Sequence, residues 1–259
     1  MAKDDKALIQ SVDRALRLLE DIAEAPGTPR SLADLAAVLD IDRSSVFRLL
    51  TTLSRHGLVR QDEGEKGYRL GFGIYRLAGR LRAQEKMTDL ANPYLKRLVR
   101  ESGENAHLAV RAGLRCVFID RESGPRTLTA NTNIGDTEEL YCTAVGKSLI
   151  CRCSEAELDD LFAQMDLLPY TENTQTDPGR IREDLARIRD GAVAVDDEEY
   201  ESGVFCLAVP LVNFEGTVEA ALGLSGPAVR LRPRRRELEA RLLDLGREIG
   251  RLLGGAGED

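Results

Sequence analysis

The stretch that decides the fold runs from Ser31 to Arg60 and reads SLADLAAVLDIDRSSVFRLLTTLSRHGLVR. Ser31 is a favoured helix N-cap, and Asp34 lies three residues on, where a capping-box carboxylate belongs. The apolar residues that follow recur at helical spacing, which predicts a short amphipathic helix. After a polar interruption, Asp42 is placed to cap a second helix. Two short helices joined by a tight polar turn are typical of a helix-turn-helix.

The outer face of the second predicted helix is basic and rich in hydroxyl groups. From Arg43 to Arg60 there are four arginines and no acidic residue, in a chain whose net charge is -8. This pattern indicates a DNA-reading helix, because arginine pairs well with guanine in the major groove. An ordinary all-helical domain with a solvated arginine face has the same pattern, and the motif alone does not separate the two. The residues of this helix expected to contact DNA are Arg43, Ser44, Ser45, Arg48 and Thr52.

A small hairpin is predicted directly after this helix. Residues 58–61 and 68–70 read as two short strands around a polar turn, which makes the unit a winged helix-turn-helix. Arg60, Lys66 and Arg69 are candidate phosphate contacts on this wing, which would position the protein without reading sequence. A helix from Asp13 to Glu24, with Ser11 as its expected cap, precedes the motif and would brace it.

Charge is distributed unevenly along the 259 residues, a length that fits two domains. Residues 1–82 hold 14 basic and 12 acidic side chains, whereas the remainder carries a net charge of -10. A mildly basic front and an acidic body suit a protein that presents only one end to DNA. The acidic total argues against a protein that binds polyanions over its whole surface.

Targeting signals and disulfide patterns are not evident in the sequence. The chain has no apolar run near 18 residues and no apolar signal-peptide core at its start. Its five cysteines are odd in number and scattered, which argues against a disulfide framework. We therefore expect a cytoplasmic protein that does not associate with membranes.

The second part of the chain mixes strands and helices. Gly113 lies between two strand-like runs, 105–111 and 114–121, which predicts a hairpin. Runs of strand and helix character elsewhere indicate an antiparallel sheet with packed helices, so the predicted class is α+β. The further expected strands are 127–131, 192–195, 204–212 and 217–225, and the expected helices are 87–102, 143–151, 154–165, 177–190 and 233–253.

Six segments, in order and at matching spacing, resemble the IclR-type bacterial transcription regulators over nearly the whole chain. They are SVDRALRLLEDIA (11–23), DRSSVFRLLTTLSRHGLV (42–59), YRLGFGIYRLAG (68–79), GDTEELYCTAVGKSLI (135–150), DDEEYESGVFCLAVPL (196–211) and VEAALGLSGPAVRL (218–231). The resemblance implies a winged helix-turn-helix over residues 1–71, a linker helix over 72–86 and a GAF-like effector-binding domain over 87–259. It further implies a homodimer, with pairing of two dimers left open.

The function implied by this resemblance is sequence-specific transcription regulation, more often repression than activation. The partners are a double-stranded DNA operator and a small metabolite, expected to be a carboxylic acid or a sugar-derived compound, that changes operator affinity. A small-molecule-processing enzyme and a non-specific DNA binder are the alternatives. No enzymatic activity, cofactor or metal is expected, because neither the histidines nor the cysteines form a recognisable catalytic or metal-binding set.

The expected effector site begins at Thr143, where a helix starts. The first N–H groups of a helix have no partner inside it and attract a carboxylate. The resemblance places a ligand carboxylate at the backbone of Ala144 and Val145. The full effector-binding set that it implies is Leu140, Thr143, Ala144, Val145, Asp196, Val204, Cys206, Leu222 and Ser225.

Four residues near this site depart from the family pattern. Glu138 and Glu139 replace a small apolar residue and a proline, and they would repel a multiply charged acid if they point inward. Tyr141 replaces a common histidine, and Gly223 stands where a second pocket serine can occur. These departures leave open a neutral or polyhydroxylated ligand.

Overall fold

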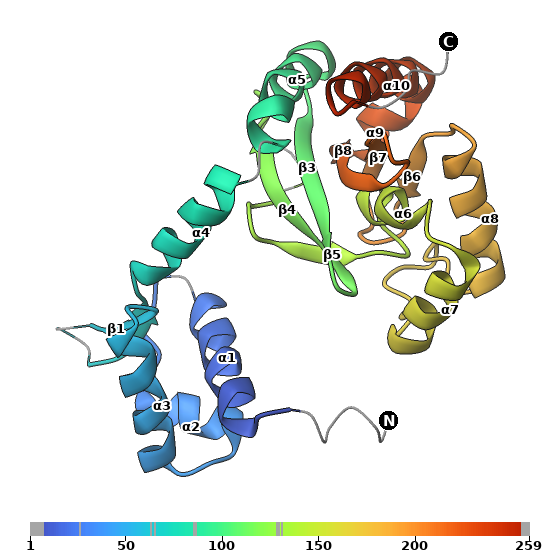
Figure 1. Ribbon diagram of the computed structural model, residues 1–259. Coiled ribbons are helices and arrows are strands. Elements are labelled where there is room, and N and C mark those ends of the chain that lie inside the picture. The colour runs from blue at the N-terminus through green and yellow to red at the C-terminus, as the bar shows by residue number, and fades with distance from the viewer. Residues whose placement is uncertain are drawn as a thin grey trace. The chain divides into compact units, whose positions relative to one another are not determined.

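The computed structural model describes residues 8–25, 27–62, 64, 66–84, 87–127, 130 and 132–254. The chain forms two compact units, Met1–Glu85 and Lys86–Asp259, and each has its own hydrophobic core (Figure 1). Within the described residues, no helix combines the length and the apolar character that crossing a membrane requires.

The first unit is a three-helix core with a two-stranded hairpin and a following helix. Leu18, Leu35, Val46 and Leu50 are fully buried where the first three helices meet. The predicted winged helix-turn-helix is thereby confirmed. Its elements are α1 (Gln10–Ala23), α2 (Leu32–Leu39), α3 (Arg43–Arg55), β1 (Val59–Gln61), β2 (Tyr68–Leu70) and α4 (Gly73–Gln84).

Two of the three predicted caps in this unit are present. Ser31 Oγ accepts a hydrogen bond from the backbone N–H of Asp34 at 3.2 Å, and Asp42 accepts one from the N–H of Ser45 at 2.9 Å. The prediction that Ser11 caps α1 is wrong. The helix begins at Gln10, so its N-cap is Ile9, which has no polar side chain to offer.

The second unit contains a six-stranded antiparallel sheet with strand order β5-β4-β3-β8-β7-β6. The short edge strand β5 was not predicted; it pairs with β4 through Arg115 and Glu139. The strand expected over 127–131 includes residues 128, 129 and 131, which lie outside the described residues. The strands are β3 (Asn105–Ala112), β4 (Arg115–Glu122), β5 (Thr137–Glu139), β6 (Ala194–Asp197), β7 (Val204–Val212) and β8 (Val218–Pro227).

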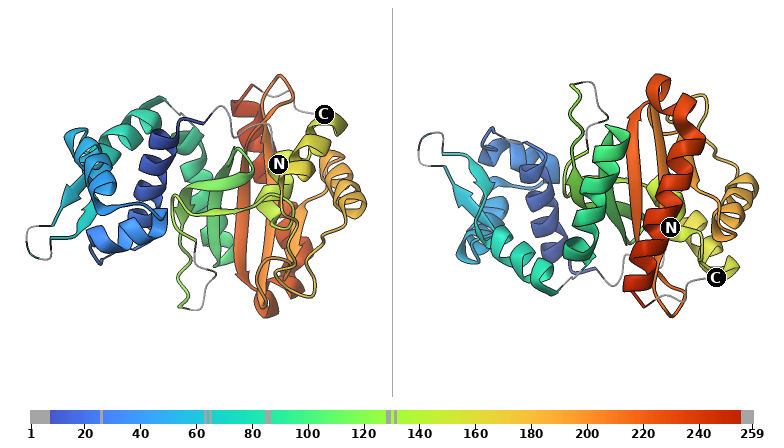
Figure 2. Two further views of the ribbon diagram at one scale, coloured as in Figure 1. Left: turned by 90° about the horizontal axis from the view of Figure 1, so that it is seen from below. Right: turned by 90° about the horizontal axis from the view of Figure 1, so that it is seen from above.

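Helices cover both faces of this sheet, as Figures 1 and 2 show. On one face α5 and α10 pack over β3, β7 and β8, and on the other α6 lies against β7 and β8 with α8 beside β6. The sheet therefore separates two apolar cores. The helices are α5 (Met87–Ser102), α6 (Ala144–Ile150), α7 (Glu155–Gln164), α8 (Pro178–Arg189), α9 (Ala228–Leu231) and α10 (Arg235–Leu252), with a 3-10 turn η1 (Arg232–Arg234) before the last.

Candidate functional site

The outer face of α3 presents two arginines without intramolecular partners. Arg43 and Arg48 are both exposed. Across the part of the chain that the structure describes, neither guanidinium forms an ion pair or a side-chain hydrogen bond. Arginine in this state retains all five N–H donors for a ligand such as a base edge or a phosphate.

The hydroxyl groups expected to contact DNA are engaged within α3. Ser44 Oγ donates to Asp42 at 2.5 Å, and Ser45 Oγ donates to the other oxygen of the same carboxylate at 2.7 Å. These bonds, led by that from Ser44, lower the pKa of Asp42. Thr52 Oγ1 donates to the carbonyl of Arg48 at 3.0 Å. Each hydroxyl hydrogen is already used in a hydrogen bond within this segment, so these oxygens are available to a ligand mainly as acceptors.

Phe47 was missed by the sequence analysis. It lies on α3 between Val46, which is fully buried, and exposed Arg48, and 54% of its surface is accessible. An exposed aromatic on this face suits contact with a thymine methyl group. The sequence could have indicated this exposure, because Phe47 lies off the apolar stripe that forms the buried face of the helix.

The wing residues differ in how far their side chains are available to contact DNA. The Arg60 guanidinium lies 5.6 Å from the ring centre of Phe72, a cation–π distance. Arg69 forms a 3.0 Å ion pair with Asp62 across the hairpin and is therefore committed within the wing. Lys66 is exposed near the hairpin turn with a positive φ of 54°.

The second unit contains a cavity enclosing about 460 Å³ of space not filled by atoms, including its opening to solvent. Seven of the nine residues expected at the effector site line it. The lining residues are His107, Phe118, Ala130, Thr132, Glu138, Thr143, Ala144, Val145, Asp196, Tyr200, Glu201, Val204, Cys206 and Ser225.

Strand register brings three of these residues together. Asp196 on β6 is paired with Cys206 on β7, and Cys206 is paired with Ser225 on β8. Directly opposite residues in a sheet point to the same face. The row therefore presents a carboxyl, a thiol and a hydroxyl side by side, although the residues are distant in sequence.

Leu222 and Leu140 do not line the cavity. Leu222 lies three positions from Ser225 on β8, and because side chains alternate along a strand it faces the opposite core, under α5 and α10. Leu140 is fully buried with the α6 side of the sheet, behind the cavity wall. The expectation that they form apolar walls is therefore corrected; apolar contact comes from Phe118, Val145 and Val204.

The start of α6 forms one wall. Thr143 is its N-cap, with Oγ1 accepting a hydrogen bond from the N–H of Gly146 at 3.0 Å. Ala144 and Val145 follow and face the cavity, as expected. α6 has only seven residues, so its macrodipole is short and the attraction for an anion is correspondingly limited.

Several lining residues were not expected as ligand contacts. His107 lies on β3 opposite Gly223, and Tyr200 and Glu201 come from the loop after β6. The sequence gives little indication of these contacts, since a histidine on a buried strand and an acidic loop both occur in many proteins without a ligand. Glu138 had been noted as a departure from the family pattern, and it does point into the cavity.

Two carboxyl groups of the cavity hold protons more tightly than usual. Burial, followed by the nearby charges of Asp196, Asp136 and Glu201, raises the pKa of Glu138 to about 7. Burial also raises the pKa of Asp196 to about 7, against hydrogen bonds from the backbone N–H groups of Glu199 and Tyr200. Near neutral pH this site therefore takes up or releases protons readily.

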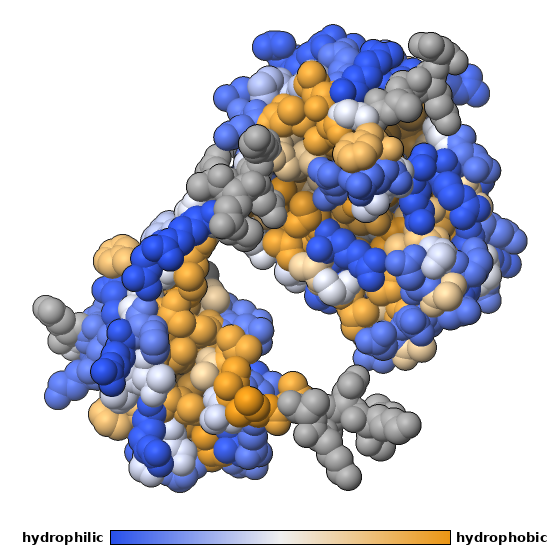
Figure 3. All heavy atoms as spheres, viewed as in Figure 1, coloured by the Kyte–Doolittle hydropathy of each residue, from blue (hydrophilic) through white to orange (hydrophobic). Residues whose placement is uncertain are grey.

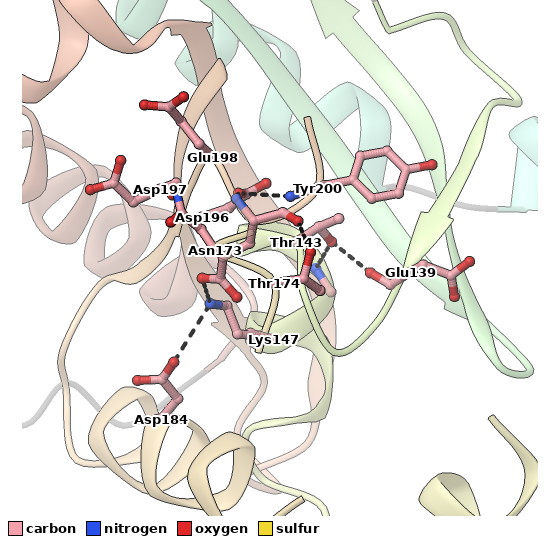
Figure 4. A network of polar contacts seen from close by, with 12 residues as sticks. Glu139, Thr143, Lys147, Asn173, Thr174, Asp184, Asp196, Asp197, Glu198 and Tyr200 are labelled. Carbon is pink, nitrogen blue, oxygen red and sulfur yellow. Dashed lines mark hydrogen bonds and ion pairs between the residues drawn. The ribbon is translucent and has the colours of Figure 1, made fainter. Parts of the chain in front are cut away.

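A buried lysine supports the loop that carries Tyr200 and Glu201. Lys147 on α6 is 2% exposed, and its Nζ lies 2.5 Å from Glu199 and 3.6 Å from Asp184 on α8. Figure 4 shows this lysine between the loop and the helix, beside Asp196. Lys147 thus links three elements beneath the cavity: α6, α8 and the loop after β6.

Metal binding finds no support in this geometry. Among the residues that the structure describes, no three His, Cys, Asp or Glu side chains are grouped so as to hold a metal ion. The cysteine Cys206 lies in the cavity wall, and burial raises the pKa of its thiol well above the ordinary value. A neutral thiol is a poor nucleophile and a poor metal ligand.

Comparison with known proteins agrees with this two-unit arrangement. A family model described as the IclR helix-turn-helix domain matches residues 11–63, and one described as the bacterial transcriptional regulator IclR C-terminal domain matches residues 83–251. The HTH-type transcriptional regulator XynR of Escherichia coli (strain K12) is 33% identical over 84% of this chain and 86% of its own.

Two further similarities span almost the whole chain. The transcriptional repressor IclR of Escherichia coli (strain K12) is 30% identical over 95% of this chain and 91% of its own length. The crystal structure of the Thermotoga maritima IclR superposes with a TM-score of 0.74 at 28% identity, covering 95% of this chain and all of that one. The chain belongs to the IclR family of bacterial transcriptional regulators.

Proposed function

We propose that α3 reads an operator and that occupancy of the cavity by a small metabolite sets how tightly the operator is held. The observation that carries this proposal is the pair of exposed arginines, Arg43 and Arg48, which have no side-chain partner in the described part of the chain and lie on the second helix of a helix-turn-helix. Relatives named as repressors support repression as the sign of regulation.

Roles on DNA follow from the contacts each side chain already makes. Arg43 and Arg48 are the proposed base readers, with Phe47 as an apolar contact. Ser44, Ser45 and Thr52 would accept hydrogen bonds, since their protons are used within the helix. Arg60 and Lys66 on the wing would contact phosphates.

The proposed effector contacts are the lining residues on β6, β7, β8 and the start of α6. Asp196, Cys206 and Ser225 supply polar contacts, and Val204 with Val145 supplies apolar ones. Of the two expected ligand classes, a sugar-derived compound is the better supported. Its hydroxyl donors match acidic lining groups, which would repel a multiply charged acid.

The proposed division of the chain is a DNA-binding domain over 1–71, a linker helix over 72–86 and an effector domain over 87–259. We further propose a homodimer that works in the cytoplasm and releases its metabolite unchanged. Exposed apolar side chains on the first unit support self-association, and Figure 3 shows hydrophobic surface over α1. They include Leu8, Ile9, Val12, Leu16, Phe72 and Tyr75.

Gel-shift titration with DNA from upstream of the gene tests the proposal, with random duplex as competitor. A specific regulator should resist a large excess of random DNA, whereas a non-specific binder should not. Small metabolites are then added singly, and one of them should change operator affinity. Recovery of that metabolite unaltered after incubation separates a regulator from an enzyme. Loss of all DNA preference would contradict the proposal.

A further inference from the structure

The cavity is acidic from three directions. Glu138 reaches it from β5, Asp196 from β6 and Glu201 from the loop after β6, and no lysine or arginine is among its described lining residues. Asp196 is the most deeply placed, at 3% exposure, whereas Glu138 is half-buried and Glu201 is exposed at the opening. An anion entering this site therefore meets three carboxyl groups and no cationic side chain among the described lining residues.

Nearby cations already have other partners, and Arg121, paired with His107 across β3 and β4, donates to the carbonyl of Thr132 and to Asn133. Lys147 pairs with Glu199 and Asp184 below the cavity, and Arg115 pairs with Glu139 at the sheet edge. Arg115 lowers the pKa of Glu138 and Lys147 that of Asp196 by their charge, but neither forms a direct ion pair with these two carboxyls. Glu138 and Asp196 therefore have no ion-pair partner among the described residues, and a cation on the ligand would supply one.

A second observation indicates that the cavity is built for a polar ligand. Ser225 is 3% exposed and lines the cavity, yet its Oγ has no hydrogen-bond partner among the described residues. A buried hydroxyl left without a partner is costly. It lies in the same cross-strand row as Asp196, so one ligand can satisfy both groups.

We propose that the effector is a small molecule carrying a protonated amine, which Glu138, Asp196 and Glu201 bind, together with a hydrogen-bonding group that meets Ser225. This inference rests on the proposed effector role of the cavity and names the ligand class. Carboxylates are strong acceptors for an ammonium group, which offers three donors.

The protonation behaviour of the cavity agrees with this assignment. Burial raises the pKa values of Glu138 and Asp196 to about 7, and repulsion adds to it, from Asp196 on Glu138 and from Glu199 on Asp196; a bound cation relieves that repulsion. Burial lowers the pKa of His107 to about 4, so the imidazole is neutral and adds no positive charge. The titratable groups that line or flank the site are Glu138, Asp196, Glu201, His107, Tyr200, Cys206, Glu199, Lys147, Asp136, Arg115 and Arg121.

Two matched sets of probes test the charge preference at two ligand sizes. The smaller set is 3-amino-1,2-propanediol, glycerol and glycerate, and the larger is 1-amino-1-deoxysorbitol, sorbitol and gluconate. Each set offers a cation, a neutral molecule and an anion on one carbon frame. Affinity for the full-length protein is measured by calorimetry at pH 8 and pH 6.

The amine should be the tightest member of at least one set, by about tenfold over the neutral probe. Its binding should weaken about tenfold from pH 8 to pH 6, because a carboxyl with a pKa near 7 must be ionised to hold it. An anion that binds best in both sets, binding that strengthens toward pH 6, or no binding in either set would overturn the inference.

Single substitutions show which residues produce the preference for the amine. Asp196→Asn and Glu138→Gln should each reduce the preference for the amine, while Glu183→Gln on the exposed face of α8 should leave it unchanged. If an anion binds best and Asp196→Asn alters its affinity, the cavity is a ligand site of another class, so the inference fails and the proposed function stands. The proposed function fails separately if no metabolite changes operator affinity.

Discussion

The imidazole of His107 fills the space that a side chain at position 223 would need. The two residues are paired across β3 and β8, and a Cβ on Gly223 would lie 2.3 Å from Nε2 of His107 and 2.8 Å from Cγ1 of Val145. His107 is 4% exposed and meets the ring of Phe118 edge-on at 5.1 Å, so it has little room to move aside. Gly223 and His107 therefore form one coupled part of the cavity wall.

Gly223→Ala should lower the free energy of unfolding by about 1–3 kcal/mol, the usual cost of overpacking a buried site. Chemical denaturation of the full chain measures it. In a His107→Ala background the same substitution should cost less, because the imidazole is gone. Gly79→Ala on α4 is the control, since a Cβ there meets nothing within 4 Å. Equal costs in both backgrounds would show that the two positions are independent.

Arg48→Ala should weaken operator binding by about 1–3 kcal/mol, the usual worth of a base contact. The guanidinium has no partner to lose among the residues that the structure describes, so the stability of the protein should be unchanged. Gel-shift titration at fixed salt measures the loss.

Arg247→Ala on α10 removes the same charge from an exposed position in the other unit and serves as the control for Arg48→Ala. Unchanged operator affinity for Arg48→Ala would remove this residue from the reading face. A loss that is equal for all DNA sequences would reassign it to phosphate contact.

Much of the fold was predictable because local signals agreed with tertiary packing. Ser31 and Asp42 mark their helices by capping chemistry that acts within one turn, and both caps are present. The prediction for Ser11 failed because the helix starts at Gln10, two residues before the start that a cap at Ser11 requires, a shift of a kind that sequence does not resolve. The edge strand β5 escaped prediction because three polar residues become a strand only by pairing with β4.

The candidate site was less predictable, because it depends on register across strands. Leu222 and Ser225 were assigned to the same wall, but strand alternation places them on opposite faces. His107 joins the cavity only because β3 pairs with β8 opposite a glycine. Lys147 carried no sequence signal of burial, since its two acidic partners come from distant elements.

The stability of the unliganded protein should fall as pH rises from 6.5 to 8. The folded-state pKa values of Glu138 and Asp196, about 7, lie above those of free carboxyls, so the folded state binds protons that the unfolded state has already released. Raising the pH through 7 removes these protons at a cost to the folded state alone. Thermal melting across this window measures the slope.

The pH window stops at 6.5 because His107 changes the stability of the fold in the opposite direction at lower pH. Its folded-state pKa, lowered to about 4 by burial, means that protonation of the unfolded chain below pH 6.5 disfavours folding. In the double variant Glu138→Gln/Asp196→Asn the melting temperature should vary less between pH 6.5 and 8. A slope that persists unchanged in the double variant would assign it to other groups.

Lys147→Met should lower the free energy of unfolding by about 3–5 kcal/mol, because it leaves the carboxylate of Glu199, whose side chain is 13% exposed, without its cation. One oxygen of Glu199 already lacks a hydrogen-bond partner among the described residues, so the loss of Nζ leaves the group poorly compensated. Adding Glu199→Gln should recover part of the loss, since the unpaired charge is then removed. Denaturant unfolding of the single and double variants measures this coupling. The control is Lys96→Met on the exposed face of α5, whose free energy of unfolding should stay within about 0.5 kcal/mol of that of the parent protein. Additive costs for the two substitutions would mean that the ion pair does not tie α6 to the cavity loop.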